Sequence, residues 1–246
     1  MNTLTAEAVS PHRQNDLAVF RGVEAWIFDL DNTLYPRSAK VFDQVDARIR
    51  AYVAKLLNVD DSEAQRIQKG FYREHGTTLR GLMLTHDIDP DAFLEFVHDI
   101  DHSCVRADPD LGAALLRLPG KRYIFTNGSR RHAEKVAERL GFPTHFEDIF
   151  DIVDANLVPK PERATYDLFV NRFGVRPERA AMFEDLARNL TVPKAVGMTT
   201  VLVVPPGTRE VFHDEWEYEG RDDDHVDFVT DDLARFVGQI ADAIGA

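Results

Sequence analysis

The sequence predicts an α/β protein with a doubly wound parallel sheet and a helical domain inserted after the first strand. Short apolar runs resemble strands that are buried on both faces; they are Trp26–Phe28, Tyr123–Phe125, Ala180–Phe183 and Thr200–Val204. From residue 109 onward these runs alternate with segments of helical spacing, which is the pattern of a parallel sheet with helices packed against it. Between residues 37 and 105 the periodicity is helical throughout, which predicts the insertion.

The N-terminal half of the chain predicts an arm, a strand and then helices. Residues 1–20 are polar with weak periodicity, and we expect a disordered N-terminal arm there. After the first strand, Ser38 is a candidate N-cap. It precedes a helix whose apolar residues recur at three- and four-residue steps from Val41 to Leu56. Three further helices are expected over residues 60–72, 77–86 and 90–100.

The C-terminal half predicts alternating helices and strands. Helices are expected over 109–118, 133–140, 164–173 and 231–244, with further short strands at 150–153 and 226–229. Gly141 and Gly174 follow two of these helices, as glycines commonly do at helix ends. We therefore divide the chain into a core domain, residues 21–36 and 106–246, and a helical cap domain, residues 37–105.

Composition limits the functions that the chain can have. The formal net charge of −13 disfavours nucleic acid and anionic membrane surfaces as partners. No apolar run approaches the roughly 20 residues needed to span a bilayer, and the first twenty residues lack the apolar segment of a secretory signal. Cys104 is the only cysteine, so no internal disulfide can form. We expect a soluble cytoplasmic protein, and the sequence gives no indication of its oligomeric state.

Polar residues lie at the ends of four of the predicted elements. Asp29 and Asp31 follow the first strand, Thr126 and Asn127 follow the second, Lys160 precedes a helix, and Glu184 with Asp185 ends another strand. In open parallel sheets, ligands bind outside the carboxyl ends of the strands. If these ends meet at one edge of the sheet, they bring carboxylates, a hydroxyl, a helix N-terminus and an ammonium group together.

This combination of groups suits a phosphoryl group bound to Mg²⁺. Carboxylate and carbonyl oxygens are hard ligands for Mg²⁺, which also takes substrate phosphate. An Asp carboxylate can attack phosphorus to form an aspartyl-phosphate, and a second acid can protonate the leaving alcohol and then activate water. Thr126 and the helix N-terminus after it can bind phosphate, and Lys160 can steady the charge that develops.

The order of these motifs resembles the haloacid dehalogenase-like hydrolase superfamily. The matching stretches run Asp29-Leu-Asp31-Asn-Thr33, Thr126-Asn127-Gly128, Lys160-Pro161 and Glu184-Asp185-Leu-Ala-Arg-Asn189. The resemblance implies that Asp29 is the nucleophile, Asp31 the general acid/base and Lys160 the charge-stabilising residue. It implies phosphate binding by Thr126, Asn127 and Lys160. It also implies Mg²⁺ binding by Asp29, the Asp31 backbone carbonyl and Asp185, with Glu184 either a ligand or a neighbour of one.

The sequences of several stretches are similar to those of the pyrimidine 5′-nucleotidase subgroup of that superfamily. These stretches are residues 29–36, 99–103, 118–129 and 159–161. The resemblance implies a nucleoside 5′-monophosphate as substrate. His102 and Ser103, near the return from the cap to the core, are candidate substrate-selecting residues. Two alternatives stay open: a phosphatase or phosphomutase for sugar phosphates or other small phosphoesters, and a phosphate-binding or phosphoaccepting module without turnover.

Overall fold

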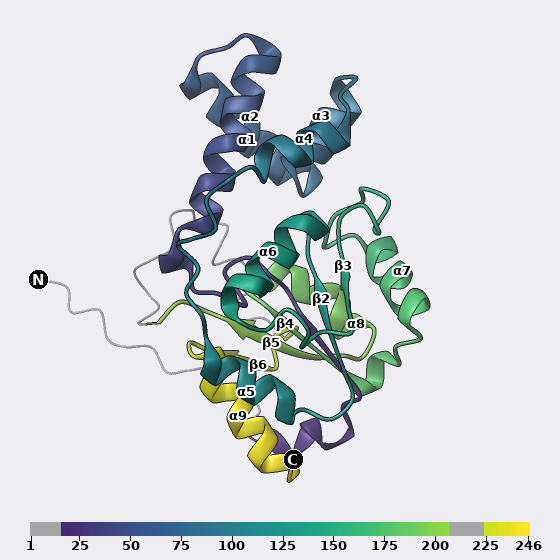
Figure 1. Ribbon diagram of the computed structural model, residues 1–246. Helices are drawn as coiled ribbons and strands as arrows, with labels where there is room; N and C mark the ends of the chain where they lie inside the picture. Colours follow the sequence, from purple (N-terminus) through teal and green to yellow (C-terminus); the bar gives the residue numbers. More distant parts are fainter. Residues whose placement is uncertain (1–15, 207–223) are drawn as a thin grey trace, which may run out of the picture.

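The computed structural model describes residues 16–206 and 224–246, and these fold around a six-stranded parallel sheet (Figure 1). The strand order is β3-β2-β1-β4-β5-β6. In chain order the strands are β1 (Ala25–Phe28), β2 (Lys121–Phe125), β3 (Asp148–Phe150), β4 (Ala180–Glu184), β5 (Thr199–Val203) and β6 (Phe228–Thr230). The order reverses direction at β1, as in doubly wound folds. The predicted fold class is confirmed.

Strand β1 lies in the middle of the sheet because its residues can be buried on both faces. It pairs with β2 on one side and β4 on the other, and all four of its residues are buried. The Phe28 ring stacks on the Phe183 ring of β4 at a centroid distance of 4.5 Å. The Trp26 indole N–H donates to the Pro119 carbonyl at 2.6 Å, which satisfies the one polar atom of that buried side chain. The carboxyl end of β1, which Asp29 follows, is therefore held firmly against β4.

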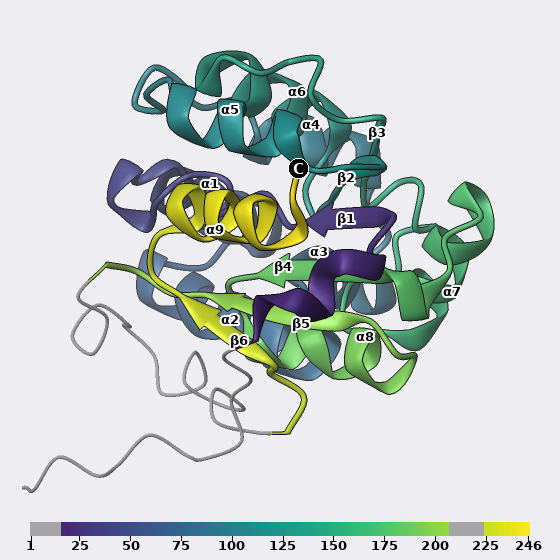
Figure 2. The same cartoon turned by 90° about the horizontal axis from the view of Figure 1, so that it is seen from below.

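Helices cover both faces of the sheet (Figure 2). The residues that pack with Trp26, Phe28 and Phe183 come from α5 (Pro109–Arg117), α6 (Arg130–Leu140) and α9 (Leu233–Ile244). The opposite face, which carries Ile27 and Phe125, packs against α7 (Arg163–Phe173) and the region of α8 (Thr191–Ala195). Burial on both faces explains why the strand sequences are nearly continuous apolar runs.

Four helices between β1 and α5 form a separate layer beside the strand ends (Figure 1). These cap helices are α1 (Val41–Leu57), α2 (Asp61–His75), α3 (Thr78–Thr85) and α4 (Pro90–Val97). They share a hydrophobic core that includes Val53, Leu82 and Phe93. Asp60, Thr77 and Asp89 cap three of them by accepting hydrogen bonds from backbone N–H groups of the first turn. No helix in the described ranges is long and apolar enough to cross a membrane.

Some local expectations differ from the structure. The predicted arm, residues 1–20, overlaps a 3₁₀-helix at Leu17–Gly22 because Phe20 is fully buried against Trp26 and Phe228; residues 1–15 lie outside the described residues. Ser38 is not the N-cap of α1. It lies in a short 3₁₀-helix, and Lys40, in a left-handed conformation, precedes α1. The strand expected at 150–153 is β3, two residues earlier in the chain.

Candidate active site

The polar residues at the strand ends line one cavity between the sheet and the cap helices. Asp29 directly follows β1 and its N–H donates to the Phe183 carbonyl at 2.9 Å, while the Thr126 N–H after β2 donates to the Phe150 carbonyl at 3.0 Å. These backbone bonds continue the sheet for one residue and fix where each side chain begins. The cavity has a volume of about 550 Å³, and its core side is lined by Asp29, Asp31, Thr126, Asn127, Lys160, Glu184 and Asp185. The structure therefore brings together the residues that the sequence placed at four separate elements.

Lys160 is buried among acceptors at the base of the cavity. Its Nζ donates to Asp29 Oδ1 at 2.7 Å, to Glu184 Oε2 at 2.7 Å and to the Phe125 carbonyl at 2.9 Å. Its side chain is 1% exposed. Burial alone would lower the pKa of Lys160, but the charges of Asp29 and Glu184 raise it above its ordinary value. All three ammonium protons are thus used, two by the carboxylates of Asp29 and Glu184 and one by the Phe125 carbonyl.

Asp29, Glu184 and Asp185 form a carboxylate cluster with an excess of negative charge. Each offers an oxygen atom within 4.8 Å of the others. Burial and the charge of Glu184 raise the pKa of Asp29 to about 7, although Lys160 opposes the shift. Burial, together with the charges of Glu184 and Asp29, raises the pKa of Asp185 well above its ordinary value. One ammonium does not balance three carboxylates, and a divalent cation would supply the missing charge.

The donor set of this cluster fits a hard divalent cation. Carboxylate oxygens are the ligands that Mg²⁺ takes in phosphate-processing sites. Within the cluster, Glu184 is the most engaged residue, since Oε2 accepts from Lys160 and Oε1 accepts from the Leu186 N–H at 3.3 Å. Asn189 also lines the cavity, and its buried Oδ1 has no hydrogen-bond partner among the described residues. The acidic cluster can therefore hold a metal ion.

Thr126 and Asn127 have different surroundings. Thr126 Oγ1 accepts the Gly128 N–H at 2.9 Å, which leaves its own hydroxyl proton for a ligand oxygen. The Asn127 side chain is already occupied: Oδ1 accepts the Lys160 N–H at 2.8 Å, and Nδ2 donates to the Lys160 carbonyl at 3.3 Å. The Asn127 amide thus fixes the backbone of Lys160, and phosphate binding by Asn127, for which its backbone N–H remains available, stays a prediction.

Asp31 is held by two residues that sequence analysis did not single out. Its Oδ1 accepts the Tyr35 hydroxyl at 2.5 Å and lies 2.9 Å from His132 Nε2. Burial would raise the pKa of Asp31, but the charge and hydrogen bond of His132 and the hydrogen bond of Tyr35 together lower it. Tyr35 lies four residues after Asp31 in the turn that follows β1, and His132 lies in the first turn of α6. The sequence does hold one signal for the role of His132: it is a histidine three residues after the Ser129 N-cap, just beyond the Thr-Asn-Gly stretch.

His102 and Ser103 do not reach the cavity. Neither lies in its lining. His102 Nε2 is 2.9 Å from His132 Nδ1, and burial lowers the pKa of His102 to about 4, with a further contribution from the charge of His132. Ser103 Oγ donates to Asp101 Oδ2 at 2.7 Å, on the surface. Neither residue contacts the cavity directly, and their role in substrate selection stays a prediction.

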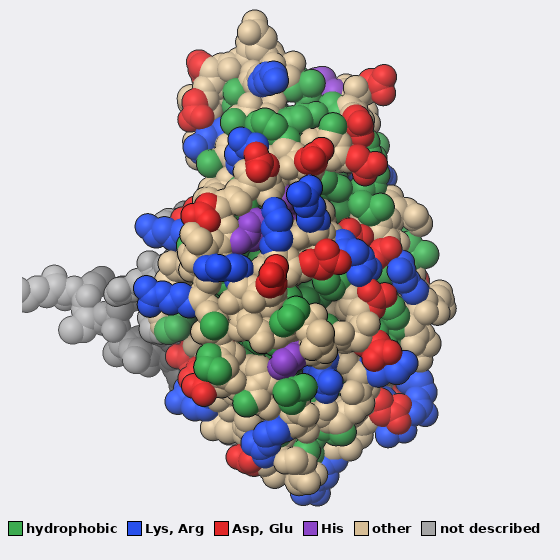
Figure 3. All heavy atoms as spheres, in the orientation of Figure 1, with side chains coloured by type: hydrophobic (Ala, Val, Ile, Leu, Met, Phe, Trp, Pro, Cys, Tyr) green, Lys and Arg blue, Asp and Glu red, His purple; other side chains and the backbone are tan. Residues whose placement is uncertain are grey.

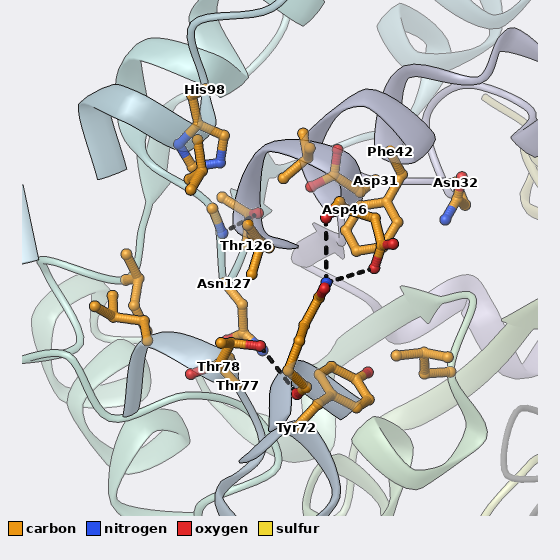
Figure 4. A pocket seen from close by; sticks show the side chains of 18 of the residues that line it. Asp31, Asn32, Phe42, Asp46, Tyr72, Thr77, Thr78, His98, Thr126 and Asn127 are labelled. Carbon is orange, nitrogen blue, oxygen red and sulfur yellow. Dashed lines mark hydrogen bonds between the residues drawn. The ribbon is translucent and has the colours of Figure 1, made fainter. Parts of the chain in front are cut away.

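The cap helices supply the opposite wall of the cavity. In Figure 4, His98, Thr126 and Asn127 lie on one side, Asp31 and Phe42 face them, and Tyr72, Thr77 and Thr78 close another side. Much of the cap wall is apolar and comes from Val45, Ile49, Leu79, Phe93, Leu94 and Val97. Gln68 is a buried polar exception. Its Nε2 donates to the Asp46 carbonyl and to Asp46 Oδ1, whereas its Oε1 is buried without a partner in the described part of the chain.

The cap also contacts the segment that carries Lys160. Gly76, at the turn between α2 and α3, has a φ of +81°, and a Cβ there would lie 3.2 Å from the Pro159 ring and 3.5 Å from the Lys160 carbonyl. Nearby, the Arg188 guanidinium lies 4.4 Å from the centroid of the Tyr72 ring at the end of α2. The cap is thus closed onto the core at this turn, and the cavity lies between the two layers.

Comparisons with known proteins agree with this architecture. The family model described as haloacid dehalogenase-like hydrolase matches residues 23–197. The chain is 27% identical over 197 residues to phosphate metabolism protein 8 of Saccharomyces cerevisiae, covering 73% of this chain but only 61% of the yeast protein. It is also 27% identical over 225 residues to glyceraldehyde 3-phosphate phosphatase of Methanopyrus kandleri, covering 85% of this chain and 93% of the relative.

Solved structures share the fold. The CbbY structure from Rhodobacter sphaeroides, in complex with phosphate, superposes with a TM-score of 0.56 at 20% identity, covering 87% of this chain and 96% of the other. A phosphatase structure from Thermococcus onnurineus gives a TM-score of 0.54 at 19% identity, with the same coverage. The family model spans most of the chain, including every strand end at which the carboxylates and Lys160 meet. The chain therefore belongs to the haloacid dehalogenase-like hydrolases.

Proposed function

We propose that this protein is a Mg²⁺-dependent phosphomonoesterase that forms an aspartyl-phosphate on Asp29, and that its substrates are pyrimidine nucleoside 5′-monophosphates. The observation that carries the chemistry is the placement of Asp29 and Asp31 in one cavity with Lys160 and Thr126. These groups provide a nucleophile, a second carboxyl group, a fixed positive charge and a hydroxyl donor. Relatives named glyceraldehyde 3-phosphate phosphatase support the same reaction class.

The reaction would take place in two steps. In the first, an Asp29 carboxylate oxygen bonds to phosphorus, the bond from phosphorus to the ester oxygen breaks, and the protonated form of Asp31, a minor form because His132 and Tyr35 lower its pKa, gives its proton to the leaving oxygen. In the second, a water oxygen attacks phosphorus and gives a proton to Asp31, and the bond from phosphorus to Asp29 breaks. Inorganic phosphate leaves, and both carboxyl groups return to their starting states.

The remaining groups would assist both steps. Lys160 holds Asp29 and meets the negative charge that develops on the phosphoryl oxygens. The Thr126 hydroxyl and the backbone N–H groups at the start of α6 would bind the phosphoryl oxygens. The metal would be held by the Asp29 and Asp185 carboxylates and the Asp31 backbone carbonyl. Glu184 accepts hydrogen bonds from Lys160 and the Leu186 N–H, and it would lie beside the metal ligands without binding the metal itself. When bound, Mg²⁺ neutralises charge between the carboxylate nucleophile and the phosphate.

The cap wall favours a substrate with a flat, largely apolar leaving group. Its aliphatic and aromatic residues can contact the faces of a base. Gln68 adds a hydrogen-bond acceptor: both protons of its amide are used by Asp46, so Oε1 is the atom left for a ligand. An unsatisfied buried acceptor costs about 1–3 kcal/mol, which a ligand N–H would recover. Uracil has an N–H at N3 and cytosine has an amino group, and either can donate to this oxygen.

A second candidate substrate class is a small sugar phosphate. It is favoured by the relatives whose names specify glyceraldehyde 3-phosphate. Such a substrate would leave the apolar part of the cap wall largely uncovered. The chemistry at Asp29 and Asp31 would be the same for both classes.

Phosphate release from a panel of esters tests this proposal. The panel contains UMP, CMP, their deoxy forms, purine monophosphates and sugar phosphates, each measured with and without Mg²⁺. We expect release that requires Mg²⁺ and a kcat/KM that ranks highest for UMP or CMP. A ranking led by sugar phosphates would favour the second class. Release from no ester would exclude turnover and leave a phosphate-binding or phosphoaccepting module.

Two variants separate the chemistry from substrate choice. Asp29→Asn should keep the melting temperature within a few degrees and abolish release from every ester, because the nucleophile is lost. Gln68→Met should lower kcat/KM for UMP about 10-fold, which corresponds to about 1.4 kcal/mol, and leave a small acyclic phosphoester unaffected. Gln239→Met, on the exposed face of α9, is the matched control. Equal losses for both esters in Gln68→Met would contradict the base-binding role.

The other expectations on partners and location follow from charge and cysteine content. On the face in Figure 3, acidic side chains are interspersed with Lys and Arg, so that face offers no extended basic surface for a polyanion. We infer that the partner is a small phosphoester rather than nucleic acid or membrane. The single cysteine, Cys104, suits a reducing cytoplasm, which we propose as the location.

A further inference from the structure

The second carboxyl group of the site is held from one side only. Both hydrogen bonds to Asp31 end on Oδ1, one from the Tyr35 hydroxyl at 2.5 Å and one from His132 Nε2 at 2.9 Å. Among the described residues, Asp31 Oδ2 has no hydrogen-bond partner. Asp31 lines the cavity, and its side chain is 17% exposed. Oδ2 is therefore the oxygen available to a ligand.

His132 is itself fixed at its second nitrogen. Its side chain is fully buried, and Nδ1 lies 2.9 Å from Nε2 of His102. The ring also stacks on the His98 ring at a centroid distance of 4.7 Å and an interplanar angle of 16°. His98 is anchored in turn, since its Nδ1 lies 3.0 Å from both the Leu94 carbonyl and Ser129 Oγ. The imidazole of His132 therefore has no room to rotate away from Asp31.

Tyr35 is held just as firmly. It is 2% exposed, and the chain reaches it through a tight turn after β1 in which the Leu34 N–H donates to the Leu30 carbonyl at 3.0 Å. This turn brings the phenol back over Asp31, four residues earlier. Tyr35 and His132 come from segments about a hundred residues apart in sequence, yet they meet at the same oxygen atom. Two independent elements thus fix one torsional state of the carboxyl group.

We propose that His132 and Tyr35 are positioning residues that hold Asp31 by Oδ1 so that Oδ2 serves as the proton-transfer atom for the leaving oxygen and then for water. This inference rests on the proposed phosphoesterase function. A general acid must lie within hydrogen-bond reach of the oxygen that it protonates. An error of about 1 Å in that position costs about 100-fold in rate. A carboxyl group free to rotate would present either oxygen and spend part of its time turned away.

The proposal separates two kinds of substrate. The leaving oxygen of UMP is an alkoxide and needs a proton, whereas p-nitrophenolate is stable without one. Poor positioning of Asp31 should therefore slow the first step for UMP but not for p-nitrophenyl phosphate. The second step, attack of water, needs Asp31 in both cases. For p-nitrophenyl phosphate the result is a burst of p-nitrophenolate followed by slow release of phosphate.

The test compares His132→Leu, His132→Gln and Tyr35→Phe with the wild type in rapid-mixing assays on both esters. We expect His132→Leu to lower kcat for UMP about 10- to 100-fold with KM nearly unchanged. On p-nitrophenyl phosphate it should give a burst of about one p-nitrophenolate per enzyme at the wild-type rate. His132→Gln, whose amide N–H can still reach Oδ1, should recover most of the activity. His145→Leu, which has no contact with Asp31, is the control for a His-to-Leu change.

The outcomes are distinguishable. A wild type that releases phosphate from no ester would overturn the proposed function and not this inference alone. An active wild type with a normal His132→Leu variant, or a variant whose burst phase slows as much as its UMP turnover, would overturn the positioning role. If His132→Leu fails to fold, as judged by its melting curve, Tyr35→Phe decides, because it removes a donor to the same oxygen without removing a ring. A normal rate on UMP in that variant would then contradict the proposal.

Discussion

The side chain of Asn127 is hydrogen-bonded to both backbone polar groups of Lys160. Its Oδ1 accepts the N–H at 2.8 Å and its Nδ2 donates to the carbonyl at 3.3 Å. The two residues are 33 positions apart, on the loop after β2 and on the segment before α7. This pairing fixes the backbone of Lys160, and thereby the position from which its buried side chain extends to Asp29.

Replacing Asn127 should therefore impair Lys160 without touching its charge. In Asn127→Ala the Lys160 backbone loses both bonds, and we expect kcat/KM on the best ester of the panel to fall about 10- to 100-fold. Asn171→Ala, on the exposed surface of α7, is the matched control and should be unchanged. Steady-state kinetics checks this. A variant that keeps the wild-type value would show that Lys160 is placed adequately by its own three hydrogen bonds.

Mg²⁺ should stabilise the folded chain through the carboxylate cluster. A ligand that binds only the native state adds about 2.7 kcal/mol when its concentration is 100 times its Kd. We expect the melting temperature to rise with Mg²⁺ in the wild type and to respond much less in Asp185→Asn, which removes one carboxylate of the cluster. Asp242→Asn, at the exposed end of α9, is the control. A wild-type melting temperature that is independent of Mg²⁺ would count against metal binding at the cluster.

Below pH 6.5 the buried His98 should make a destabilising contribution to the free energy of unfolding, opposite in sign to that of Asp29 and Asp185, whose raised pKa values favour proton uptake in the folded state. Burial, and the charge of His132 beside it, lower the pKa of His98 to about 3 from an ordinary 6.5. Below pH 6.5 the unfolded chain binds a proton that folded His98 does not, so this contribution to stability is complete above that pH and declines as the pH falls toward 3. His98 alone should account for about 2 kcal/mol between pH 7 and pH 5.

Denaturant unfolding of the metal-free protein at several pH values checks this expectation. The groups that face His98 are His132, His102 and Asp31, and His102 acts in the same direction because its pKa is also lowered. The informative comparison is thus the pH slope of the wild type against that of His98→Asn, which cannot take up a proton. A variant with the wild-type slope would mean that the pKa of His98 is not lowered by folding.

Gly120 is required by the turn into β2. Its φ is +84°, and a Cβ there would lie 2.3 Å from the Glu24 carbonyl oxygen, which accepts the Lys121 N–H at 2.9 Å. Gly120→Ala should lower the free energy of unfolding by about 1–3 kcal/mol or more, since both the conformation and the contact are strained. Gly238→Ala in α9, where a Cβ has open space, should instead stabilise by about 0.5–1 kcal/mol. Chemical denaturation of the pair tests the contrast, which equal effects would contradict.

The strands and the polar residues at their ends could be predicted from the sequence because both depend on local patterns. A run such as Ala25–Phe28 indicates a strand buried on both faces, and a polar residue directly after it must lie at the sheet edge. The same reasoning places Asp29, Thr126 and Asp185 around one cavity, in agreement with the structure. The helical insertion was equally accessible, since its four helices carry their own apolar periodicity and caps.

The partners of individual polar atoms could not be predicted in this way. Nothing in the local sequence says that the Asn127 amide reaches the Lys160 backbone, or that His132 and Tyr35 meet at one oxygen of Asp31. Such pairs depend on side-chain directions at sites far apart in sequence. His102 is another example. Its position in the sequence, near the return from the cap to the core, suggested contact with the substrate, but its ring lies against His132. The burial of Phe20 could not be predicted because a single aromatic residue in a polar stretch gives no hydrophobic periodicity.

The turn at Gly76 has a consequence for how such an enzyme can change over evolution. A Cβ at Gly76 would lie 3.2 Å from the Pro159 ring, and its φ of +81° is strained for other residues, so a larger residue would disturb the contact between the cap and the segment that carries Lys160. Changes at Gly76 would therefore alter the rate for every substrate alike. Changes on the apolar walls of α1 and α4 would alter only the preference among substrates. We therefore expect substitutions at Gly76 and substitutions on the apolar cap wall to separate effects on rate from effects on substrate preference.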